Sequence, residues 1–197
     1  MKLVPDRIEA FLEFDGVISD HDSIRVKVTE VVQFCHNDLQ KAKAIFEWVR
    51  DNIPHTKDID GEVVTCTSID VLDKGTGICF AKSHLVASMM RMINIPCGFC
   101  YQLFKNDLDM NSDSLALHGL NAVFLESTGK WHRVDPRGNR NDVRAEFSTD
   151  GEILAFPELK FLNDCIYAQP LEKVVRGLQD APSISSLWPN LPSIPIT

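Results

Sequence analysis

The sequence has few cations for its length, no long apolar run and no apolar segment at its start. Its 20 Lys and Arg residues stand against 28 Asp and Glu residues, giving a net charge of −8, whereas a broad nucleic-acid surface needs clustered cations. No stretch of about 18 apolar residues is present, so we expect no membrane-spanning segment. Residues 1–6 contain no signal-peptide core. We therefore expect a cytoplasmic protein with neither nucleic-acid nor membrane partners.

Cysteine is sparse as well. Six cysteines among 197 residues are too few for a disulfide scaffold, and the expected reducing compartment does not favour disulfides. Each cysteine is therefore a buried apolar side chain, a metal ligand or a nucleophile. The apolar share of 44% and the charged share of 24% are typical of a folded globular chain.

Hydrophobic periodicity places most helices in the first half of the chain and strands after them. The clearest helix contains one apolar stripe formed by Ala42, Ile45, Phe46 and Val49. The order of the elements predicts an α+β fold, in which N-terminal helices pack on an antiparallel sheet. The expected elements are helices at residues 23–35, 38–52, 69–73, 78–93 and 170–179 and strands at residues 97–104, 118–126 and 130–136.

Three stretches lack such periodicity. Residues 139–169 give weak signals, and residues 182–197 contain four prolines, which predict an extended tail. We therefore expect one domain over residues 1–181, with its core at about residues 40–140, followed by an extended Pro-rich tail. The acidic residues 106–114 predict a surface loop that leads into a strand beginning at His118, so this loop is a candidate gate of a cleft.

The segment Gly75-Thr76-Gly77-Ile78-Cys79 carries the first chemical signal. Its glycines allow a sharp turn into the expected buried helix at residues 78–93, so Cys79 lies in the first turn of that helix. Unpaired N–H groups and the positive end of the helix dipole favour a thiolate there. The same N–H groups, including that of Cys79, can donate to an oxyanion formed from an attacked carbonyl.

His118 and Asp135 provide the second signal, because a thiolate nucleophile needs an imidazole and the imidazole needs an orienting carboxylate. The two residues lie on consecutive predicted strands, 17 positions apart. If the hairpin loop spans residues 126–129, Asp135 lies opposite Leu120, on the same face as His118 and diagonal to it. A loop centred one residue later would separate the two side chains, so the chemistry predicts this register.

These residues resemble the transglutaminase-like superfamily, whose members are papain-type Cys-His-Asp acyl-transfer enzymes. The likeness covers about residues 40–140: the helix at 42–53, the segment 68–96 around Cys79, and the strands of His118 and Asp135. More narrowly, the segments around these three residues look like small bacterial stand-alone members, and this similarity extends to residues 154–157 and 169–175. The resemblance implies a transglutaminase-like or papain-like cysteine protease fold.

By the same resemblance, Cys79 is the nucleophile, His118 the general base and acid, and Asp135 the orienting carboxylate. This sequence departs from the family pattern at a residue pair expected to line the cleft. Many members follow the histidine with Ala-Trp, whereas this chain has Gly119-Leu120. Substrate preference therefore cannot be inherited from better-known members. No upstream side chain matches an oxyanion donor of the family, so only the backbone N–H of Cys79 is assigned to that role.

The pair Cys97 and Cys100 has the spacing of a zinc or redox motif. A zinc site needs a second ligand pair, and a strand points residues i and i+3 to opposite faces. A redox motif would open a helix after a strand, whereas this pair opens an aromatic strand. We therefore expect no metal and no cofactor.

The other histidines lack such support. His84 lies about 140° around the helix from Cys79, which predicts a packed or solvent-edge side chain. His132 differs from Asp135 in strand parity and faces the other side of the sheet. His21, His36 and His55 have no supporting constellation of residues.

Two classes of function remain open. One is an enzyme that opens amide, isopeptide or ester bonds through a thioester, with a peptide, a protein or a small amide or ester as substrate. A hydrolase is favoured over a crosslinking enzyme, because crosslinking requires that water lose the competition. The other class is a non-catalytic scaffold or peptide-binding module with the same fold. An acetyltransferase using coenzyme A ranks lower, since no basic phosphate-binding cluster is present. The sequence leaves the oligomeric state open.

Overall fold

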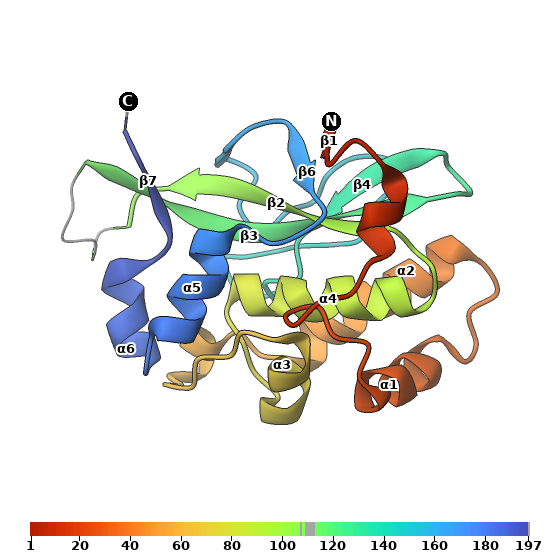
Figure 1. The fold of residues 1–197 in the computed structure, drawn as a ribbon, viewed down its shortest axis with the longest axis horizontal. Helices are drawn as coiled ribbons and strands as arrows, with labels where there is room; N and C mark the ends of the chain where they lie inside the picture. Colours follow the sequence, from red (N-terminus) through yellow and green to blue (C-terminus); the bar gives the residue numbers. More distant parts are fainter. Residues whose placement is uncertain (107, 109–112, 197) are drawn as a thin grey trace.

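A layer of helices lies against a curled, mostly antiparallel sheet in the computed structural model (Figure 1), which describes residues 1–106, 108 and 113–196. The helices are α1 (Asp22–Val32), α2 (Asp38–Asn52), α3 (Ser68–Lys74), α4 (Cys79–Met92), α5 (Glu172–Asp180) and α6 (Ile184–Leu187), with 3₁₀ turns η1 (Ile8–Leu12), η2 (Thr56–Ile59) and η3 (Trp188–Asn190). The strands are β1 (Lys2–Val4), β2 (Cys97–Phe104), β3 (Ser114–Leu125), β4 (Lys130–Val134), β5 (Lys160–Phe161), β6 (Cys165–Tyr167) and β7 (Ser193–Pro195). The predicted α+β class is confirmed.

Local sequence signals explain where the helices begin and end. Asn37 caps α2 by accepting a hydrogen bond from the backbone N–H of Gln40, and the helix stops before Pro54. Thr67 and Asp70 form a reciprocal capping box at the start of α3. Gly75 ends α3 with a φ of 65°, a left-handed conformation that glycine adopts without strain.

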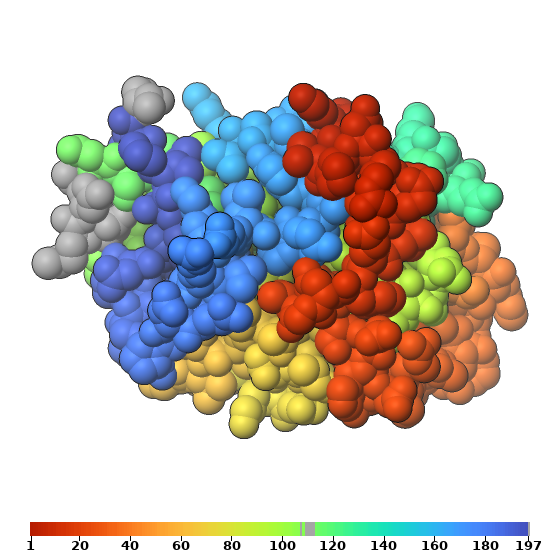
Figure 2. Space-filling model, in the orientation of Figure 1, coloured from red at the N-terminus to blue at the C-terminus, as the bar shows by residue number. Residues whose placement is uncertain are grey.

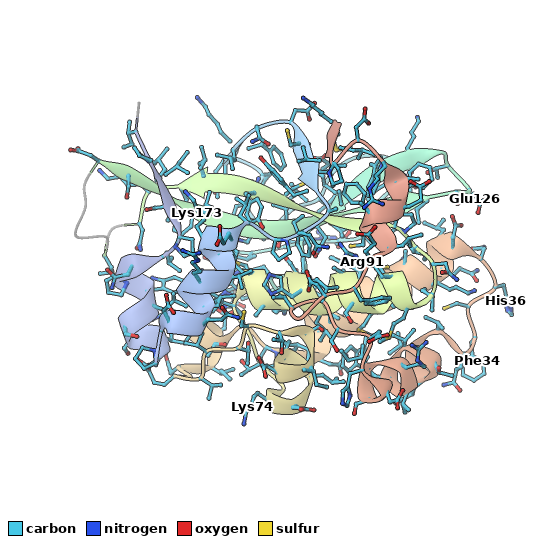
Figure 3. The ribbon with its side chains drawn as sticks, in the orientation of Figure 1. Phe34, His36, Lys74, Arg91, Glu126 and Lys173 are labelled. Atoms are coloured by element: carbon cyan, nitrogen blue, oxygen red, sulfur yellow. The ribbon has the colours of Figure 1, made fainter. Side chains whose placement is uncertain are left out.

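Helix α4 is the centre of the core. Nearly all of its side chains are buried, because α1, α2 and α3 cover it on one side and β2 and β3 on the other. Arg91 near its C-terminal end is buried too, and its guanidinium donates to the carbonyls of Glu13, Cys97 and Ala168. Figure 3 places Arg91 in the middle of the molecule, whereas Phe34 and His36 project from the α1–α2 loop.

The sheet has the order β1-β6-β2-β3-β4, with β5 added to β2 and β7 added to β3. One edge of β3 is divided between two partners, because β7 pairs with Ser114–Ala116 and β4 pairs with Asn121–Leu125. No strand of the described part of the chain pairs with residues 118–120 on that edge. His118 therefore lies at a gap in the sheet, where a side chain can meet groups from other layers.

The C-terminal segment differs from the predicted extended tail. Residues 184–190 are helical, because Ser183 and Ser186 form a capping box, and Ser193–Pro195 adds a strand to β3. Ile184, Leu187 and Leu191 join the main hydrophobic core. Figure 2 shows this dark-blue segment packed onto one end of the molecule. Pro189 lies within η3 and Pro195 within β7, so the prolines do not impose a continuous extended conformation here.

Two further expectations from the sequence, for residues 139–169 and 106–114, can be compared with the structure only in part. The weakly patterned residues 139–169 form the short strands β5 and β6 and isolated bridges. Of the acidic loop 106–114, residues 107 and 109–112 lie outside the described residues. Among the described helices, none has both the length and the apolar character required to cross a bilayer.

Candidate active site

Cys79 is the first residue of α4, directly after the Thr76-Gly77 turn. Ile78 is the N-cap, and its carbonyl accepts the first hydrogen bond of the helix from Lys82. The Cys79 side chain is 8% exposed, and that exposure opens into a cavity. The thiol therefore combines a helix N-terminus with access from solvent, as the sequence predicts.

His118 and Asp135 meet through the predicted hairpin register. Leu125 pairs with Lys130, so the loop spans residues 126–129, and Asn121 pairs with Val134. His118 Nε2 donates to Asp135 Oδ2 at 2.8 Å. The diagonal contact expected between the two side chains is therefore present.

Asp135 is fully buried and is held from three directions. Besides His118, it accepts hydrogen bonds from the backbone N–H groups of Arg137, at 3.1 Å, and Ala155, at 3.2 Å. The Phe156 ring meets the His118 ring edge to face, with 5.0 Å between centroids. These contacts fix the imidazole and shield its bond to the carboxylate from water.

The groups around the His118 imidazole determine its pKa. Burial alone would lower the pKa of His118, but the hydrogen-bonded Asp135 carboxylate and the neighbouring Cys79 sulfur raise the pKa to about 10. Since Nε2 faces Asp135, Nδ1 is the ring nitrogen available to Cys79. Cysteine, histidine and aspartate thus form one connected cluster.

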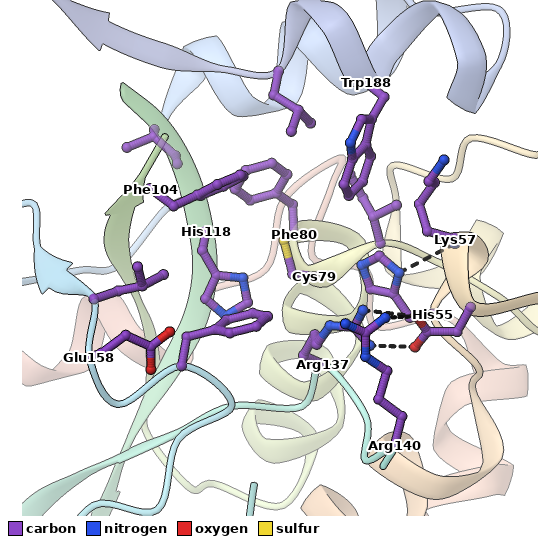
Figure 4. Close-up of a pocket in the computed structure, with 16 residues that line it drawn as sticks. His55, Lys57, Cys79, Phe80, Phe104, His118, Arg137, Arg140, Glu158 and Trp188 are labelled. Carbon is purple, nitrogen blue, oxygen red and sulfur yellow. Dashed lines mark hydrogen bonds and ion pairs between the residues drawn. The ribbon is translucent and has the colours of Figure 1, made fainter. Parts of the chain in front are cut away.

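This cluster opens into a cavity of about 420 Å³ (Figure 4). Aromatic and aliphatic side chains form most of its wall. Arg137 and Arg140, which pair with Asp58, lie on one side, and Glu158 lies on the side of His118. The residues that line it include His55, Asp58, Phe80, Arg137, Phe156 and Trp188. Such a mixture suits a substrate with an apolar portion next to a polar carbonyl.

Gly119, the departure from the family sequence, has a structural reason. A Cβ atom built on Gly119 would lie 2.5 Å from Cδ1 of Phe80, closer than real Cβ contacts. The Phe80 ring, next in the chain to Cys79, occupies the space that an alanine methyl group would need. Phe80 also lines the cavity that contains Cys79 and His118.

Lys82, one turn beyond Cys79, joins three segments behind the site. Its fully buried Nζ donates to the carbonyls of Arg50, Ile53 and Arg137 at 2.5–3.2 Å. Burial and the nearby Arg137 charge lower the pKa of Lys82 to about 7. The amine connects the end of α2, the helix of the nucleophile and the turn that follows Asp135.

Sequence reasoning missed several groups of the cavity. His55 lines the cavity although it has no motif around it, Arg137 pairs with Asp58, and Trp188 arrives from the C-terminal segment. His55 and Trp188 lie in no local pattern, because tertiary contacts bring them to the cavity. Only Arg137 had a signal, since it follows Asp135 by two residues.

The remaining cysteines and histidines are placed largely as expected. Cys97 and Cys100 point to opposite faces of β2 and enter two different apolar clusters, which disfavours a shared metal. His84 is packed, and its Nδ1 lies 2.6 Å from the carbonyl oxygen of Cys66. His132 contacts the Thr128 hydroxyl on the exposed side of the hairpin.

Comparison with known proteins identifies the family. The model of the transglutaminase-like superfamily matches residues 26–136, more than half of the chain. The chain belongs to this superfamily. Its transglutaminase-like region is similar to kyphoscoliosis peptidase of Mus musculus, with 26% identity over 153 residues, and to that of Homo sapiens, with 28% identity over 123 residues.

The matches differ in how much of each protein they cover. They include 68% and 55% of this chain but only 21% and 17% of the mouse and human peptidases, so the chain spans about a fifth of the length of these curated relatives. A solved structure described as a candidate cysteine protease from Cytophaga hutchinsonii aligns with a TM-score of 0.53 and 20% identity, covering 68% of this chain and 44% of that one. The transglutaminase-like chain therefore shares the fold of papain-like cysteine proteases.

Proposed function

We propose that this chain is a cysteine-dependent acyl-transfer enzyme that acts as a hydrolase on amide, isopeptide or ester bonds. Cys79 is the nucleophile, His118 the general base and acid, and Asp135 the orienting carboxylate. The observation that carries the proposal is the connected cluster of these three side chains at an open cavity. The similar proteins, a peptidase and a candidate cysteine protease, support the same class.

The reaction follows from the geometry. The Cys79 sulfur, as thiolate, attacks the substrate carbonyl carbon, and the electron pair of the C=O double bond moves to the oxygen. When the carbonyl forms again, the bond to the leaving amine or alcohol breaks, and His118 Nδ1 gives that group its proton. Water, deprotonated by His118, then attacks the thioester carbonyl. The C–S bond breaks, which releases the acid and restores the Cys79 thiolate.

A non-catalytic scaffold is the alternative function. A scaffold needs none of the three side chains to meet, and separations above about 8 Å, twice any hydrogen-bonded distance, would favour it. His118 Nε2 and Asp135 Oδ2 are 2.8 Å apart, and His118 and Cys79 line the same cavity. This arrangement favours the enzyme.

The first test is the rate of alkylation by iodoacetamide at neutral pH, with each cysteine followed by peptide mass spectrometry. We expect Cys79 to react fastest, a Cys79→Ser variant to lose this fast phase, and His118→Ala to slow it at least about tenfold. Cys35, which is partly exposed, serves as an internal reference within each sample. Equal rates at Cys79 and Cys35 in wild type, or no effect of His118→Ala, would refute the proposal.

A second measurement separates hydrolysis from transamidation. Model peptides, isopeptides and esters are incubated with and without an added amine, and Cys79→Ala is the blank. We expect the acid product to dominate in both conditions. A predominant amide product in the presence of the amine would assign the chain to the crosslinking class.

A further inference from the structure

His55 lies close to Cys79 although 24 residues separate them in the sequence. Its segment forms a parallel bridge with the turn before Cys79: His55 pairs with Gly77, and the backbone N–H of Thr56 donates to the Gly77 carbonyl at 3.3 Å. The hydroxyls of Thr56 and Thr76 are 3.1 Å apart and add a buried contact. The position of the His55 imidazole is therefore fixed relative to the nucleophile.

The hydrogen bonding of His55 defines which ring nitrogen carries the proton. Its Nδ1 accepts from the backbone N–H of Lys57 at 3.3 Å, so the proton of the neutral ring is on Nε2. Among the described residues, no hydrogen-bond acceptor for Nε2 is found. The side chain is 4% exposed and lines the cavity that contains Cys79 and His118.

The electrostatic surroundings keep this imidazole neutral. Burial lowers the pKa of His55 well below its usual value, and the neighbouring charges of Arg137, Lys82 and His118 lower it further, opposed by Asp58. In Figure 4 the rings of His55 and His118 lie on either side of Cys79. The two histidines thus differ in role: His118 is paired with a carboxylate, and His55 offers an uncharged N–H donor.

We propose that His55 Nε2–H is the side-chain donor of the oxyanion hole, acting with the backbone N–H of Cys79. This inference rests on the proposed function and deepens it by naming a further catalytic residue. When the sulfur of Cys79 bonds to the carbonyl carbon, negative charge forms on the substrate oxygen. His55 donates a hydrogen bond to that oxygen and keeps its own proton, so the charge and the proton count are unchanged when the carbonyl forms again.

The surroundings of His55 exclude the other catalytic role for a histidine. A general base must accept a proton at a free nitrogen, but Nδ1 of His55 is occupied by the Lys57 N–H and Nε2 already carries a proton. The Trp188 ring packs edge to face against His55, with 6.3 Å between centroids. That contact orients the ring without providing an acceptor for Nε2.

The test compares wild type with His55→Gln, His55→Asn and His55→Leu. A glutamine places an amide N–H near the position of Nε2, an asparagine places it near Nδ1, and a leucine donates no hydrogen bond. One probe is p-nitrophenyl acetate, whose acylation of Cys79 passes through an oxyanion. The other is iodoacetamide, whose displacement by sulfur forms no oxyanion. Thermal unfolding verifies that each variant is folded.

We expect the acylation rate to fall by about 10²–10³ in the Leu and Asn variants, with at least about tenfold recovery in the Gln variant. Alkylation of Cys79 stays close to the wild-type rate in all of them. The proposal would be overturned if His55→Leu were acylated at the wild-type rate or if the Gln variant were acylated no faster than the Leu variant. It would also be overturned if alkylation fell as much as acylation, or if the wild type were alkylated but not acylated.

A measurement on wild type avoids the question of folding. Acetaldehyde adds to a reactive thiol and gives a hemithioacetal whose oxygen takes the place of the oxyanion. We expect the Nε2–H proton signal of His55 to shift downfield on addition of acetaldehyde, and an unshifted signal in the adduct would overturn the proposal. Failure of the proposed function has a different signature, since alkylation of Cys79 would then not depend on His118.

Discussion

Two buried histidines in or beside α4 have opposite properties. His84, in the middle of the helix, contacts the carbonyl of Cys66, and burial lowers its pKa to about 4. His118, on β3, is equally buried, yet the Asp135 carboxylate and the Cys79 sulfur raise its pKa to about 10. Burial makes an imidazole inert, and a buried carboxylate partner reverses this effect.

The cysteines of the two regions follow the same rule. Burial raises the pKa of Cys97 and Cys100 to about 12, and the neighbouring charges of Arg91 and Arg133 offset this rise only in part. Cys79 instead has a helix N-terminus and an imidazole beside it. The reactivity of a thiol therefore depends on the groups around it, and the number of cysteines in the chain does not predict it.

The largest effect is expected when His118 loses the carboxylate partner that distinguishes it from His84. Asp135→Asn keeps the shape of the side chain but deprives His118 of its charged partner. We expect kcat/KM for p-nitrophenyl acetate to fall by about 10³–10⁴, and the pKa of His118, measured by NMR, to fall below about 10. The matched variant Asp58→Asn changes a cavity carboxylate that does not contact His118. If Asp135→Asn left both quantities unchanged, the assigned role of Asp135 would be wrong.

A smaller effect concerns the pH dependence of stability around His84. Its pKa is about 4 in the folded state and about 6.5 in an unfolded chain. Between these values the unfolded state binds more protons, so stability is lost as pH falls from about 6.5 to 4. We expect a loss of about 3 kcal/mol in the free energy of unfolding, measured in urea.

The control for this measurement is His84→Gln, which keeps a donor for the Cys66 carbonyl but does not titrate. The variant should show a flatter profile below pH 6.5. His118 has the opposite sign, since its contribution to stability is complete below about pH 6.5 and is lost as pH rises toward 10. Identical acid limbs for wild type and His84→Gln would contradict the comparison.

The smallest effect tests the packing beside Cys79. Gly119→Ala forces the Phe80 ring to move, because the new methyl group would lie 2.5 Å from Cδ1. We expect kcat/KM to fall by about 10–100-fold, as small displacements next to reacting atoms do. The double variant Gly119→Ala with Phe80→Leu makes room for the methyl group and should recover part of the loss. No recovery would show that Phe80 is not the residue displaced.

Much of the fold and part of the site could be predicted from the sequence. The stripe of α2, the buried character of α4 and the hairpin register are encoded by residues close to one another, so local patterns contain them. The expected contact between His118 and Asp135 predicted this register. The catalytic roles of Cys79, His118 and Asp135 stay predictions until the variants are measured.

The rest could not be predicted, for physical reasons. His55 reaches the cavity through a bridge between segments 22 residues apart, and Trp188 reaches it because the C-terminal segment adds β7 to β3. Such placements depend on the assembled tertiary structure and leave no periodic pattern. The tail was misread because proline content predicts extended backbone, while the Ser183 capping box favours a helix.

The junction at Lys82 has a consequence for folding. If the helices formed while the Asp135–Arg137 turn was still detached, a buried amine would lack one of its three acceptors. Such an intermediate is destabilised by the missing hydrogen bond. The buried amine therefore links the packing of α2 and α4 to the completion of the turn that positions Asp135.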